Sequence, residues 1–394
     1  MPREVWLLFI TNLINRAGMM VLPFLIVYLT RELRFTPGEA GLAFALYGGA
    51  AIVTGPIAGK LSDRIGALPI MRASLLLSGM VVLLFPLARG HASVYAITVL
   101  WASCAEAYRP ASLAAITHVV SAEQRKAAYA LNRLAINLGM SIGPALGGFL
   151  AAVSFRAMFV VDALTTIVAG LVLSLSAWQS PTRSQPDGPE SEPRIDPESL
   201  LRDGRLMVFL TATLLVGIVF FQHESALPLF MVQYLRLSPA FYGMLFTINT
   251  LLIVALEVPI NRATAHWPNA WPLFAGCMLF AIGFGALAVV SSASGILVTV
   301  VLWTFGEMML FPAMAAHLGD IAPENRRGAY MGAYSMALSV SLTLGPWIGT
   351  QLLGSTGPVG VWSVMFGFGA LAAALMVYAA PQRRSLRAAV AAGS

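Results

Sequence analysis

Charged residues and cysteines are both scarce in this sequence. Only 11% of its 394 residues are charged and 58% are hydrophobic, with a mean hydropathy of +0.78, whereas a soluble domain usually carries about 25% charged residues. The two cysteines, Cys104 and Cys277, are too few for a disulfide framework or a cysteine metal site. The scarcity of charge excludes water as the solvent for most of the surface and predicts a membrane protein.

Motifs for enzymatic chemistry, metal binding and ATP use are missing as well. The sequence holds no H-E-x-x-H, no G-x-S-x-G and no cluster of Cys and His ligands. The string GPIAGKL (55–61) is one residue shorter than a phosphate-binding loop and has no Ser or Thr after Lys60. We therefore expect no cofactor, no metal and no enzymatic activity, and ATP is not expected to drive this protein. A membrane sensor is also disfavoured, because it would need a sizeable soluble domain.

Apolar runs long enough to cross a membrane recur along the chain. A spanning helix needs roughly 20 apolar residues, whereas a membrane strand would be about 10 residues long with alternating polarity, which these runs lack. The first run is too long for a signal-peptide core, so it is interpreted as a retained helix. The predicted fold class is an all-α membrane protein with twelve transmembrane helices, at residues 5–30, 38–62, 69–88, 93–116, 127–152, 156–178, 205–233, 241–262, 270–290, 294–316, 327–353 and 358–380.

Basic residues are unevenly divided between the loops. Sixteen of the 24 Lys and Arg residues fall at the termini and in the even-numbered loops, five fall in the opposite loops, and Arg16, Arg109 and Arg133 lie within predicted helices. Loops rich in Lys and Arg stay in the cytoplasm, so we predict a multi-pass protein of the cell inner membrane with both termini cytoplasmic. The net charge of +6 follows from this topology and does not indicate a nucleic-acid partner.

A polar stretch near the middle of the chain separates two similar halves. Residues 180–205 are rich in proline and acids and have no apolar period, which predicts a flexible linker. The predicted organisation is an N-terminal six-helix bundle at 1–178, a cytoplasmic linker at 179–204, and a C-terminal six-helix bundle at 205–394 with a short cytoplasmic tail. The sequence repeats at offsets of 201 or 202 residues, since 121–133 matches 322–334, Gly143-Pro144 matches Gly345-Pro346, and Thr36-Pro37 matches Ser238-Pro239.

This repeat has a functional consequence. Six helices in each half, with the same orientation, predict parallel halves related by an axis along the membrane normal. In such folds the site lies near the bilayer midplane where the halves meet, and alternating access is the rocking of one half against the other. The repeat therefore predicts a transporter with a central cavity between two bundles.

Two motifs resemble those of a known family. The loop after the second predicted helix reads GKLSDRIG (59–66), and the fifth helix contains NLGMSIGPALGG (137–148). The first resembles the cytoplasmic loop motif of the major facilitator superfamily, although the usual basic pair after it is replaced by Ala-Leu-Pro. The second is similar to the glycine-proline motif of the drug:proton antiporter branch. The resemblance covers essentially the whole chain, and its matched positions are Gly59, Leu61, Asp63, Arg64, Gly66, Gly139, Gly143, Pro144, Gly147 and Gly148.

The physical interpretation of these motifs is conformational. Gly59 is expected to allow close backbone approach, Asp63 to face the positive end of a neighbouring helix, and Arg64 to pair across the cytoplasmic gap, which would latch one conformation. The alternative is a plain positive-inside loop with a turn glycine. In the fifth helix, small residues at a spacing of four and a proline let a helix bend and pack closely on a partner. The alternative there is a packing kink without a gating role.

Charged residues at membrane depth are costly, at about 2.5 kcal/mol or more each on insertion scales, so they are candidates for function. Glu106 and Arg109 are spaced i,i+3 in the fourth predicted helix and are expected to share a face and offset each other. The resemblance implies that helices 1, 4, 7 and 10 border the cavity, as do helices 2, 5, 8 and 11. The candidates for the substrate or proton pathway are Asn12, Asn15, Arg16, Glu106, Arg109, Arg133, Asn137, Glu224 and Glu307.

Three acids are the candidates for carrying a coupling proton. A carboxyl group in a low-dielectric site binds its proton more tightly than it does in water, as a proton-coupled transporter requires. Glu106, Glu224 and Glu307 are those candidates, and the alternative for each is a structural ion pair or a snorkelling residue. For Glu257 and Asp162 the structural interpretation is preferred. The family often places an acid in the first helix, where this chain has Arg16 instead, and Arg16 could hold an anionic solute or neutralise Glu106.

Two transport functions remain open from the sequence. The glycine-proline motif favours proton-coupled efflux of lipophilic or drug-like compounds, which suits a cavity with apolar and aromatic side chains. The alternative is a proton-coupled importer of a small polar or anionic nutrient such as a peptide or sugar, since arginines at membrane depth leave room for an anionic solute. The expected partners are a small-molecule substrate, protons and membrane lipid, and the expected state is a monomer.

Overall fold

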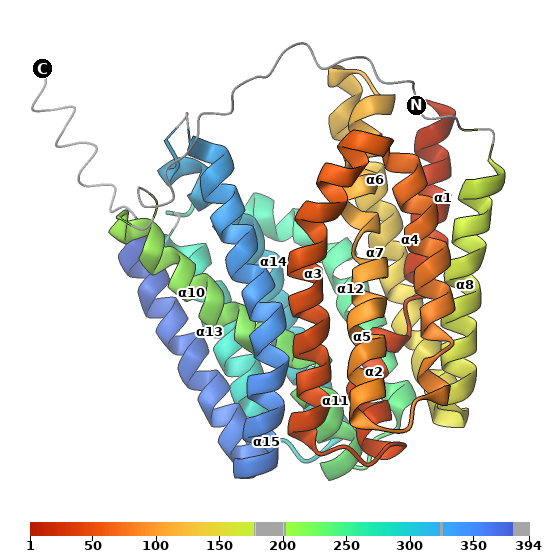
Figure 1. Cartoon of the computed structure of the whole chain (residues 1–394). Coiled ribbons are helices and arrows are strands. Elements are labelled where there is room, and N and C mark those ends of the chain that lie inside the picture. Colours follow the sequence, from red (N-terminus) through yellow and green to blue (C-terminus); the bar gives the residue numbers. More distant parts are fainter. Residues whose placement is uncertain (177, 179–199, 201, 269, 324–325, 381–394) are drawn as a thin grey trace, which may run out of the picture. The chain divides into compact units, whose positions relative to one another are not determined.

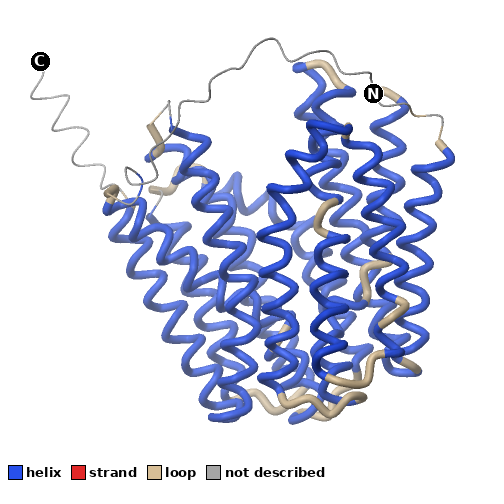
Figure 2. The backbone as a smooth tube through the Cα atoms, viewed as in Figure 1, coloured by secondary structure: helices blue, strands red, loops and turns tan. Residues whose placement is uncertain are grey.

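The computed structural model describes residues 1–176, 178, 200, 202–268, 270–323 and 326–380. Within these residues every regular element is a helix and no strand occurs (Figure 1, Figure 2). The all-α prediction is therefore confirmed for the part of the chain that the structure describes. Most of the predicted linker at 179–204 lies outside the described residues.

The helices follow one another with short connections. Those before the predicted linker are α1 (Arg3–Ala17), α2 (Val21–Arg31), α3 (Pro37–Ile65), α4 (Ala67–Val82), α5 (His91–Ala105), α6 (Tyr108–Val119), α7 (Ala122–Val153) and α8 (Phe155–Leu175), with the 3-10 turn η1 (Phe85–Leu87) after α4. Those after it are α10 (Gly204–Phe220), η2 (Phe221–Glu224), α11 (Ala226–Leu229), η3 (Phe230–Tyr234), α12 (Pro239–Thr264), α13 (Ala270–Gly285), η4 (Ala286–Ala288), α14 (Ala293–Ile321) and α15 (Arg327–Ala379).

Ten helical stretches among the described residues are long and apolar enough to cross a membrane. They agree with the predicted segments, and the helical geometry is interrupted in two places. The segment predicted at 93–116 is interrupted at Glu106 and Ala107, so it forms α5 and α6. The segments predicted at 327–353 and 358–380 both lie in α15, and the non-helical residue Gly357 divides that stretch between them.

A proline explains each of the two interruptions in helical geometry. Pro110 has no N–H group, and its ring would clash with the carbonyl of Glu106 four residues earlier in a continuous helix, so the helix breaks there. The break frees carbonyl groups at the end of α5, and one of them, that of Cys104, accepts a hydrogen bond from Ser74 Oγ at 2.6 Å. Gly357 precedes Pro358, which disfavours helical geometry at 357, and its φ of 72° is accessible to glycine at little cost.

The internal repeat is present in the backbone as well as in the sequence. The described non-glycine residues with positive φ are Arg34 (60°) and Arg236 (56°), which stand 202 positions apart. Each is followed by a residue that makes the same backbone hydrogen bond to a carbonyl six positions earlier. The Phe35 N–H donates to the Leu29 carbonyl at 3.0 Å, and its counterpart, the Leu237 N–H, donates to the Met231 carbonyl at 2.9 Å. The turn that follows the first helix of each half is therefore built in the same way.

The helix after this turn starts alike in both halves. Thr36 caps α3 through a capping box with Glu39 and is followed by proline at the first helical position, where the missing N–H of proline costs nothing. Ser238 occupies the equivalent place before α12, and its Oγ accepts the Phe241 N–H at 3.2 Å. The Thr-Pro and Ser-Pro pairs that revealed the repeat are thus helix-start signals.

Contacts divide the chain into two compact units. Unit 1 comprises residues 1–188, 223–250 and 346–354, and unit 2 comprises 189–222, 251–345 and 355–394. In unit 1, α1 packs on α7 and α8, α4 packs on α8, and α3 packs on α5. In unit 2, α13 packs on α14, and the Phe280 ring contacts Phe220 and Phe311 at centroid distances of 5.7 and 6.3 Å. Helices in lipid associate through such van der Waals packing, because lipid is as apolar as the side chains.

Candidate functional site

The first helix of the chain is broken where unit 1 carries its polar residues. The helix α1 ends at Ala17 and α2 begins at Val21, which frees backbone N–H groups at the break. The N–H groups of Met20 and Val21 both donate to Asp162 Oδ2 on α8, each at 2.8 Å. An unsatisfied N–H in a membrane interior costs several kcal/mol, and a carboxylate is favourable at a helix N-terminus. Asp162 therefore stabilises the break.

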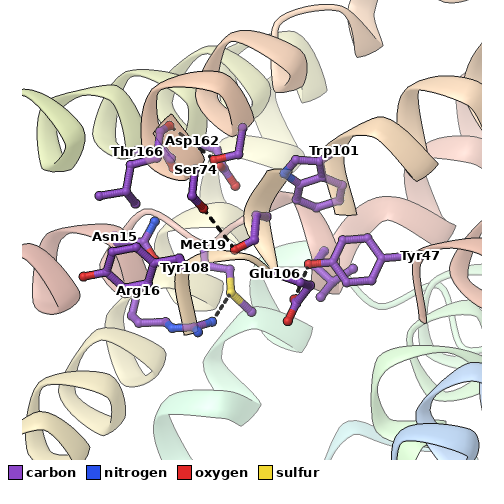
Figure 3. A pocket seen from close by; sticks show the side chains of 14 residues that line it. Asn15, Arg16, Met19, Tyr47, Ser74, Trp101, Glu106, Tyr108, Asp162 and Thr166 are labelled. Carbon is purple, nitrogen blue, oxygen red and sulfur yellow. Dashed lines mark hydrogen bonds between the residues drawn. The ribbon is translucent and has the colours of Figure 1, made fainter. Parts of the chain in front are cut away.

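A cavity lies beside this break, inside unit 1 (Figure 3). It offers about 50 Å³ of space to water, enough for a few water molecules. Side chains from α1, α2, α3, α4, α5, α6 and α8 line it, together with the Glu106 turn. Its titratable and amide side chains are Asn15, Arg16, Tyr47, Glu106, Tyr108 and Asp162.

Glu106 is held at the interruption between α5 and α6. It is half-buried, and its Oε1 accepts a hydrogen bond from Tyr47 Oη at 2.7 Å (Figure 3). Because the chain turns at Glu106 and Ala107, Arg109 does not share a helix face with Glu106. Arg109 is exposed, and the structure gives no ion pair between the two. The predicted mutual offset of Glu106 and Arg109 is therefore wrong, and the reason is the break that Pro110 imposes.

Arg16 is a cation without a carboxylate partner among the described residues. Its Nη1 contacts the Met19 sulfur at 3.0 Å (Figure 3), and its Nε is buried with no hydrogen-bond partner. A thioether is a weak acceptor. The cavity therefore contains a guanidinium that can still accept an anionic partner.

The other candidates from the first and fifth predicted helices have separate surroundings. Asn12 is buried, and its Nδ2 donates to Asn132 Oδ1 on α7 at 2.7 Å, so it joins α1 to α7. Asn15 lines the cavity. Arg133 is exposed and Asn137 half-buried on α7, and neither lines the cavity. The structure thus brings Asn15, Arg16 and Glu106 together and places Asn12, Arg133 and Asn137 elsewhere.

Glu224 and Glu307 belong to different units. Glu224 is only 8% exposed, lies 3.7 Å from His223 Nε2, and is near enough to Glu106 for their charges to interact. The His223 carbonyl accepts a hydrogen bond from Tyr242 Oη at 2.9 Å. Glu307 lies half-buried on α14 of unit 2. Unit 1 therefore contains a second acid close to the cavity acid.

The GKLSDRIG motif covers the end of α3 and its turn into α4. Gly66 has a φ of 93°, which favours glycine. Asp63 and Arg64 are exposed, and neither forms an ion pair with any described residue. A Cβ at Gly59 would meet nothing within 4 Å. The expected close approach at Gly59 is therefore wrong for this structure, because no described element packs against that face of α3.

The glycine-proline motif in α7 packs very closely. A Cβ at Gly143 would lie 2.7 Å from the Arg16 carbonyl oxygen, and one at Gly147 would lie 2.8 Å from Met20 Cβ. Gly139 faces Ala17 in the same way, at 2.8 Å from its backbone nitrogen. Because these glycines have no side chains, the broken segment of the first helix packs directly against the backbone of α7. Gly148 instead faces α12, where a Cβ would lie 2.6 Å from the Pro239 carbonyl oxygen.

A second contact of the same motif involves Pro144. Its carbonyl oxygen lies directly against Gly243 of α12, and Thr247 on the same helix donates to the Ser141 carbonyl at 2.6 Å. Small residues at a spacing of four thus make close backbone contacts on two sides of α7. The expected close packing is present, and a gating role remains a proposal.

Comparison with known families decides the class of protein. The sequence profile of the Major Facilitator Superfamily matches residues 8–238 and again residues 224–393. The chain belongs to the Major Facilitator Superfamily. Membership in this superfamily makes it a multi-pass membrane transport protein and not an enzyme.

Relatives within the superfamily cover nearly the full length of the chain. An uncharacterized MFS-type transporter of Bacillus subtilis, YqjV, is 26% identical over 96% of this chain and 94% of its own length. A Na(+), Li(+), K(+)/H(+) antiporter of Planococcus maritimus is 25% identical over 84% and 85%. The quinolone resistance protein NorA of Staphylococcus aureus is 23% identical over 89% and 90%. The resemblance to the drug:proton antiporter branch is consistent with these relatives.

Solved structures of other transporters share the fold. A POT family transporter in complex with a thioalcohol-conjugated peptide superposes with a TM-score of 0.79 at 14% identity, covering 96% of both chains. A D-xylose-proton symporter superposes with a TM-score of 0.73 at 16% identity, covering 96% of this chain and 97% of its own. At these identities the likeness is one of fold alone.

Three residues that line the cavity were given too little weight in the sequence analysis. Asp162 was expected to be structural, and Tyr47 and Ser74 were not singled out. Asp162 lies 141 or 142 positions from the N–H groups that it accepts, so no local pattern connects them. Pro110 was a usable signal for the break at Glu106, because a proline at that position is incompatible with a continuous helix.

Proposed function

We propose that this superfamily member is a secondary active transporter that exports lipophilic or drug-like compounds in exchange for protons by alternating access. The proposed architecture is twelve transmembrane helices in two parallel six-helix bundles, 1–178 and 205–394, joined by a cytoplasmic linker at 179–204. Support comes from the ten candidate spans, from α5 and α6 as one interrupted span, and from the kink at Gly357 that divides α15.

The observation that carries the proposed coupling is the environment of the Glu106 carboxyl group. Its carboxyl group lies in a water-sized cavity within a membrane-spanning region, accepts a hydrogen bond from Tyr47, and has no ion pair among the described residues. Because no described cation is paired with this carboxyl group, it can gain a proton without leaving an unpaired cation behind. Glu224, whose charge interacts with that of Glu106, and Glu307 are the further candidate carriers.

Support for efflux comes from the relatives and from the glycine-proline motif. NorA is named a quinolone resistance protein, and the Planococcus maritimus relative is named an antiporter that exchanges cations for protons. The motif residues Gly139, Gly143 and Gly147 hold the broken first helix against α7. We propose that this packing and the exposed Asp63 act as conformational elements, with Asp63 and Arg64 forming a latch in another state of the transport cycle.

Transport in everted membrane vesicles tests this function. A panel of lipophilic cations, neutral drugs and zwitterionic drugs is offered to vesicles with an imposed pH gradient, inside acidic. We expect accumulation of at least one lipophilic compound, abolished by a protonophore. Vesicles from cells without the protein are the control, and the absence of gradient-dependent accumulation across the panel would contradict the function.

A second candidate, proton-coupled import of a small polar or anionic nutrient, is favoured by Arg16. Its buried Nε without a partner would be satisfied by a carboxylate or a phosphate on a solute. Right-side-out vesicles with outside acidic pH discriminate the two functions, because import predicts uptake of small carboxylates that Arg16→Gln abolishes. Efflux of neutral compounds predicts no such dependence on Arg16.

We further propose a location in the cell inner membrane with both termini cytoplasmic, activity as a monomer among membrane lipid, and no nucleic-acid partner. The bias of Lys and Arg towards one set of loops supports this topology. A protease site introduced near Asp187 tests it, since cleavage is expected in everted vesicles and not in intact cells.

A further inference from the structure

Asp162 stands out because a carboxylate holds a backbone break within a predicted membrane span. The Met20 and Val21 N–H groups have no other acceptor among the described residues, and both bonds to Asp162 Oδ2 are 2.8 Å long. The carboxylate is only 4% exposed. The charge of Asp162 therefore determines how firmly the start of α2 is held.

Charge balance in the cavity leaves room for one additional positive charge. The ionisable groups that line it are one arginine, two carboxyl groups and two tyrosines, while α4 contributes the neutral polar groups Ser74 and Ser78. Glu224, whose charge interacts with that of Glu106, lies outside this lining together with His223, and the count covers the lining alone. With Arg16 charged, both carboxyl groups ionised and both tyrosines neutral, the net charge is one negative. One proton on either acid balances it. The groups are Arg16, Tyr47, Glu106, Tyr108 and Asp162.

Two buried polar groups indicate that the cavity holds water. Tyr108 is 4% exposed, and its hydroxyl has no hydrogen-bond partner among the described residues. Arg16 Nε is likewise buried without a partner. Polar groups in a cavity of this size are typically satisfied by ordered water. Such water would connect the two carboxyl groups that line the cavity, Glu106 and Asp162.

We propose that Asp162 exchanges a proton with Glu106 through this cavity and that the charge state of Asp162 sets the geometry of the break between α1 and α2. The ionised carboxylate accepts both N–H groups and attracts the positive end of α2. The protonated acid loses that attraction and one of its two oxygens becomes a donor. Protonation therefore loosens the break, and α1 carries Arg16 immediately before it. This inference rests on the proposed proton coupling and adds the residue that links it to helix geometry.

Amide hydrogen exchange across the break tests the proposal in the wild-type protein. The full chain in lipid nanodiscs is labelled over a pH series, and exchange at Met20 and Val21 is corrected for the chemical rate. We expect protection to fall by about 5-fold or more as pH decreases, the lower end of usual coupling strengths. In Asp162→Asn, which cannot ionise, exchange at these amides is expected to be independent of pH. Protection in the wild type that does not change with pH would overturn the proposal.

Asp203→Asn is the matched control. Asp203 also accepts two N–H groups at a helix start, those of Arg205 and Leu206 at 3.0 and 3.1 Å, but it lies outside the candidate spans. We expect Asp203→Asn to keep the pH dependence at Met20 and Val21, and to keep gradient-driven transport. Asp162→Asn is expected to lose most of that transport response while still exchanging substrate. Equal loss in both variants would show that Asp162 is only a structural cap.

The outcomes separate this inference from the proposed function. If Asp162→Asn gives little folded protein, the role of Asp162 is tested by the wild-type exchange series and by Asp162→Glu, which restores a titratable cap. Coupled export with pH-independent exchange would overturn the role of Asp162 alone. Exchange that depends on pH in a protein that exports no compound of the panel would support Asp162 and contradict the export function.

Discussion

The first helices of the two halves break at equivalent positions, and they stabilise the break with different chemistry. In the N-terminal half, Asp162 accepts the free N–H groups of Met20 and Val21. In the C-terminal half, α10 ends at Phe220, and Gln222 donates its side-chain amide to the carbonyls of Ile218 and Gly345, each at 2.8 Å. Gln222 stands 202 positions after Met20. The repeat thus preserves the break, and the hydrogen bonds described here come from a carboxylate at the first break and from an amide at the second.

The closeness of packing against the break also differs between the two halves. A Cβ at Gly143 would lie 2.7 Å from the Arg16 carbonyl oxygen, whereas one at its counterpart Gly345 would lie 3.2 Å from Ile218 Cα. The position equivalent to Gly139 is Ser341, whose Oγ donates to the Leu214 carbonyl at 3.1 Å. The N-terminal half therefore uses bare glycine contact where the C-terminal half uses a hydroxyl and looser packing.

Gly143→Ala is expected to have the largest effect on stability in this comparison. Its added Cβ would press on backbone, which cannot move aside as a side chain can, at a cost of about 1 to 3 kcal/mol. Gly345→Ala is expected to be close to neutral, because its contacts are longer and alanine favours helix. Thermal unfolding of both variants in detergent measures the difference. Equal melting temperatures would contradict the asymmetry.

Gln222→Leu tests the break in the other half. It removes two hydrogen bonds to backbone carbonyls, each worth about 0.6 to 1.5 kcal/mol, and the leucine keeps similar volume. The loss of unfolding free energy is expected to be the same at all pH values at which the protein is folded, because an amide does not titrate. Denaturant unfolding at several pH values checks this, and a loss that varies with pH would conflict with an uncharged cap.

Asn12→Ala is expected to have a smaller effect. The side chain makes one buried hydrogen bond, to Asn132 at 2.7 Å, and such bonds between membrane helices are worth about 0.6 kcal/mol on average. A double-mutant cycle with Asn132→Ala isolates the pair. The two single losses should exceed the additional loss in the double variant, and simple additivity would show that the pair is not coupled.

Asp203→Asn is expected to have the smallest effect, and one that depends on pH. Partial burial raises the pKa of the Asp203 carboxyl, but hydrogen bonds from Tyr330 Oη at 2.5 Å and from the Leu206 and Arg205 N–H groups outweigh it and hold that pKa below its usual value. A lowered pKa in the folded state adds stability above the unfolded-state pKa, which is lost as pH falls through the folded-state pKa. Asparagine is itself a good N-cap, so the variant should lose only the charge–dipole contribution, about 0.3 kcal/mol at neutral pH, and less in acid. A loss that grows in acid would reverse the sign.

Much of the fold was predictable because lipid constrains it strongly. Long apolar runs place the spans, and the Thr-Pro and Ser-Pro helix starts make the repeat visible. A local rule failed at Glu106, where Pro110 overrides a continuous apolar pattern. The role of Asp162 depends on a contact across more than 140 residues, which one sequence does not reveal. Arg16 and Glu106 were predicted as site residues, but the missing pair with Arg109 required the geometry of the turn.

Gradient-driven transport by Glu106→Gln in proteoliposomes tests the central claim most directly. Glutamine keeps the size of the side chain and can still accept the Tyr47 hydrogen bond, but it cannot titrate. Because Arg109 is not paired with Glu106, the variant is expected to fold in normal yield, which is quantified in parallel. We predict that substrate exchange persists while the response to a pH gradient falls by about tenfold or more. Full coupling in Glu106→Gln would contradict the account, and Glu307→Gln, measured in parallel, shows whether the other candidate acid carries the proton instead.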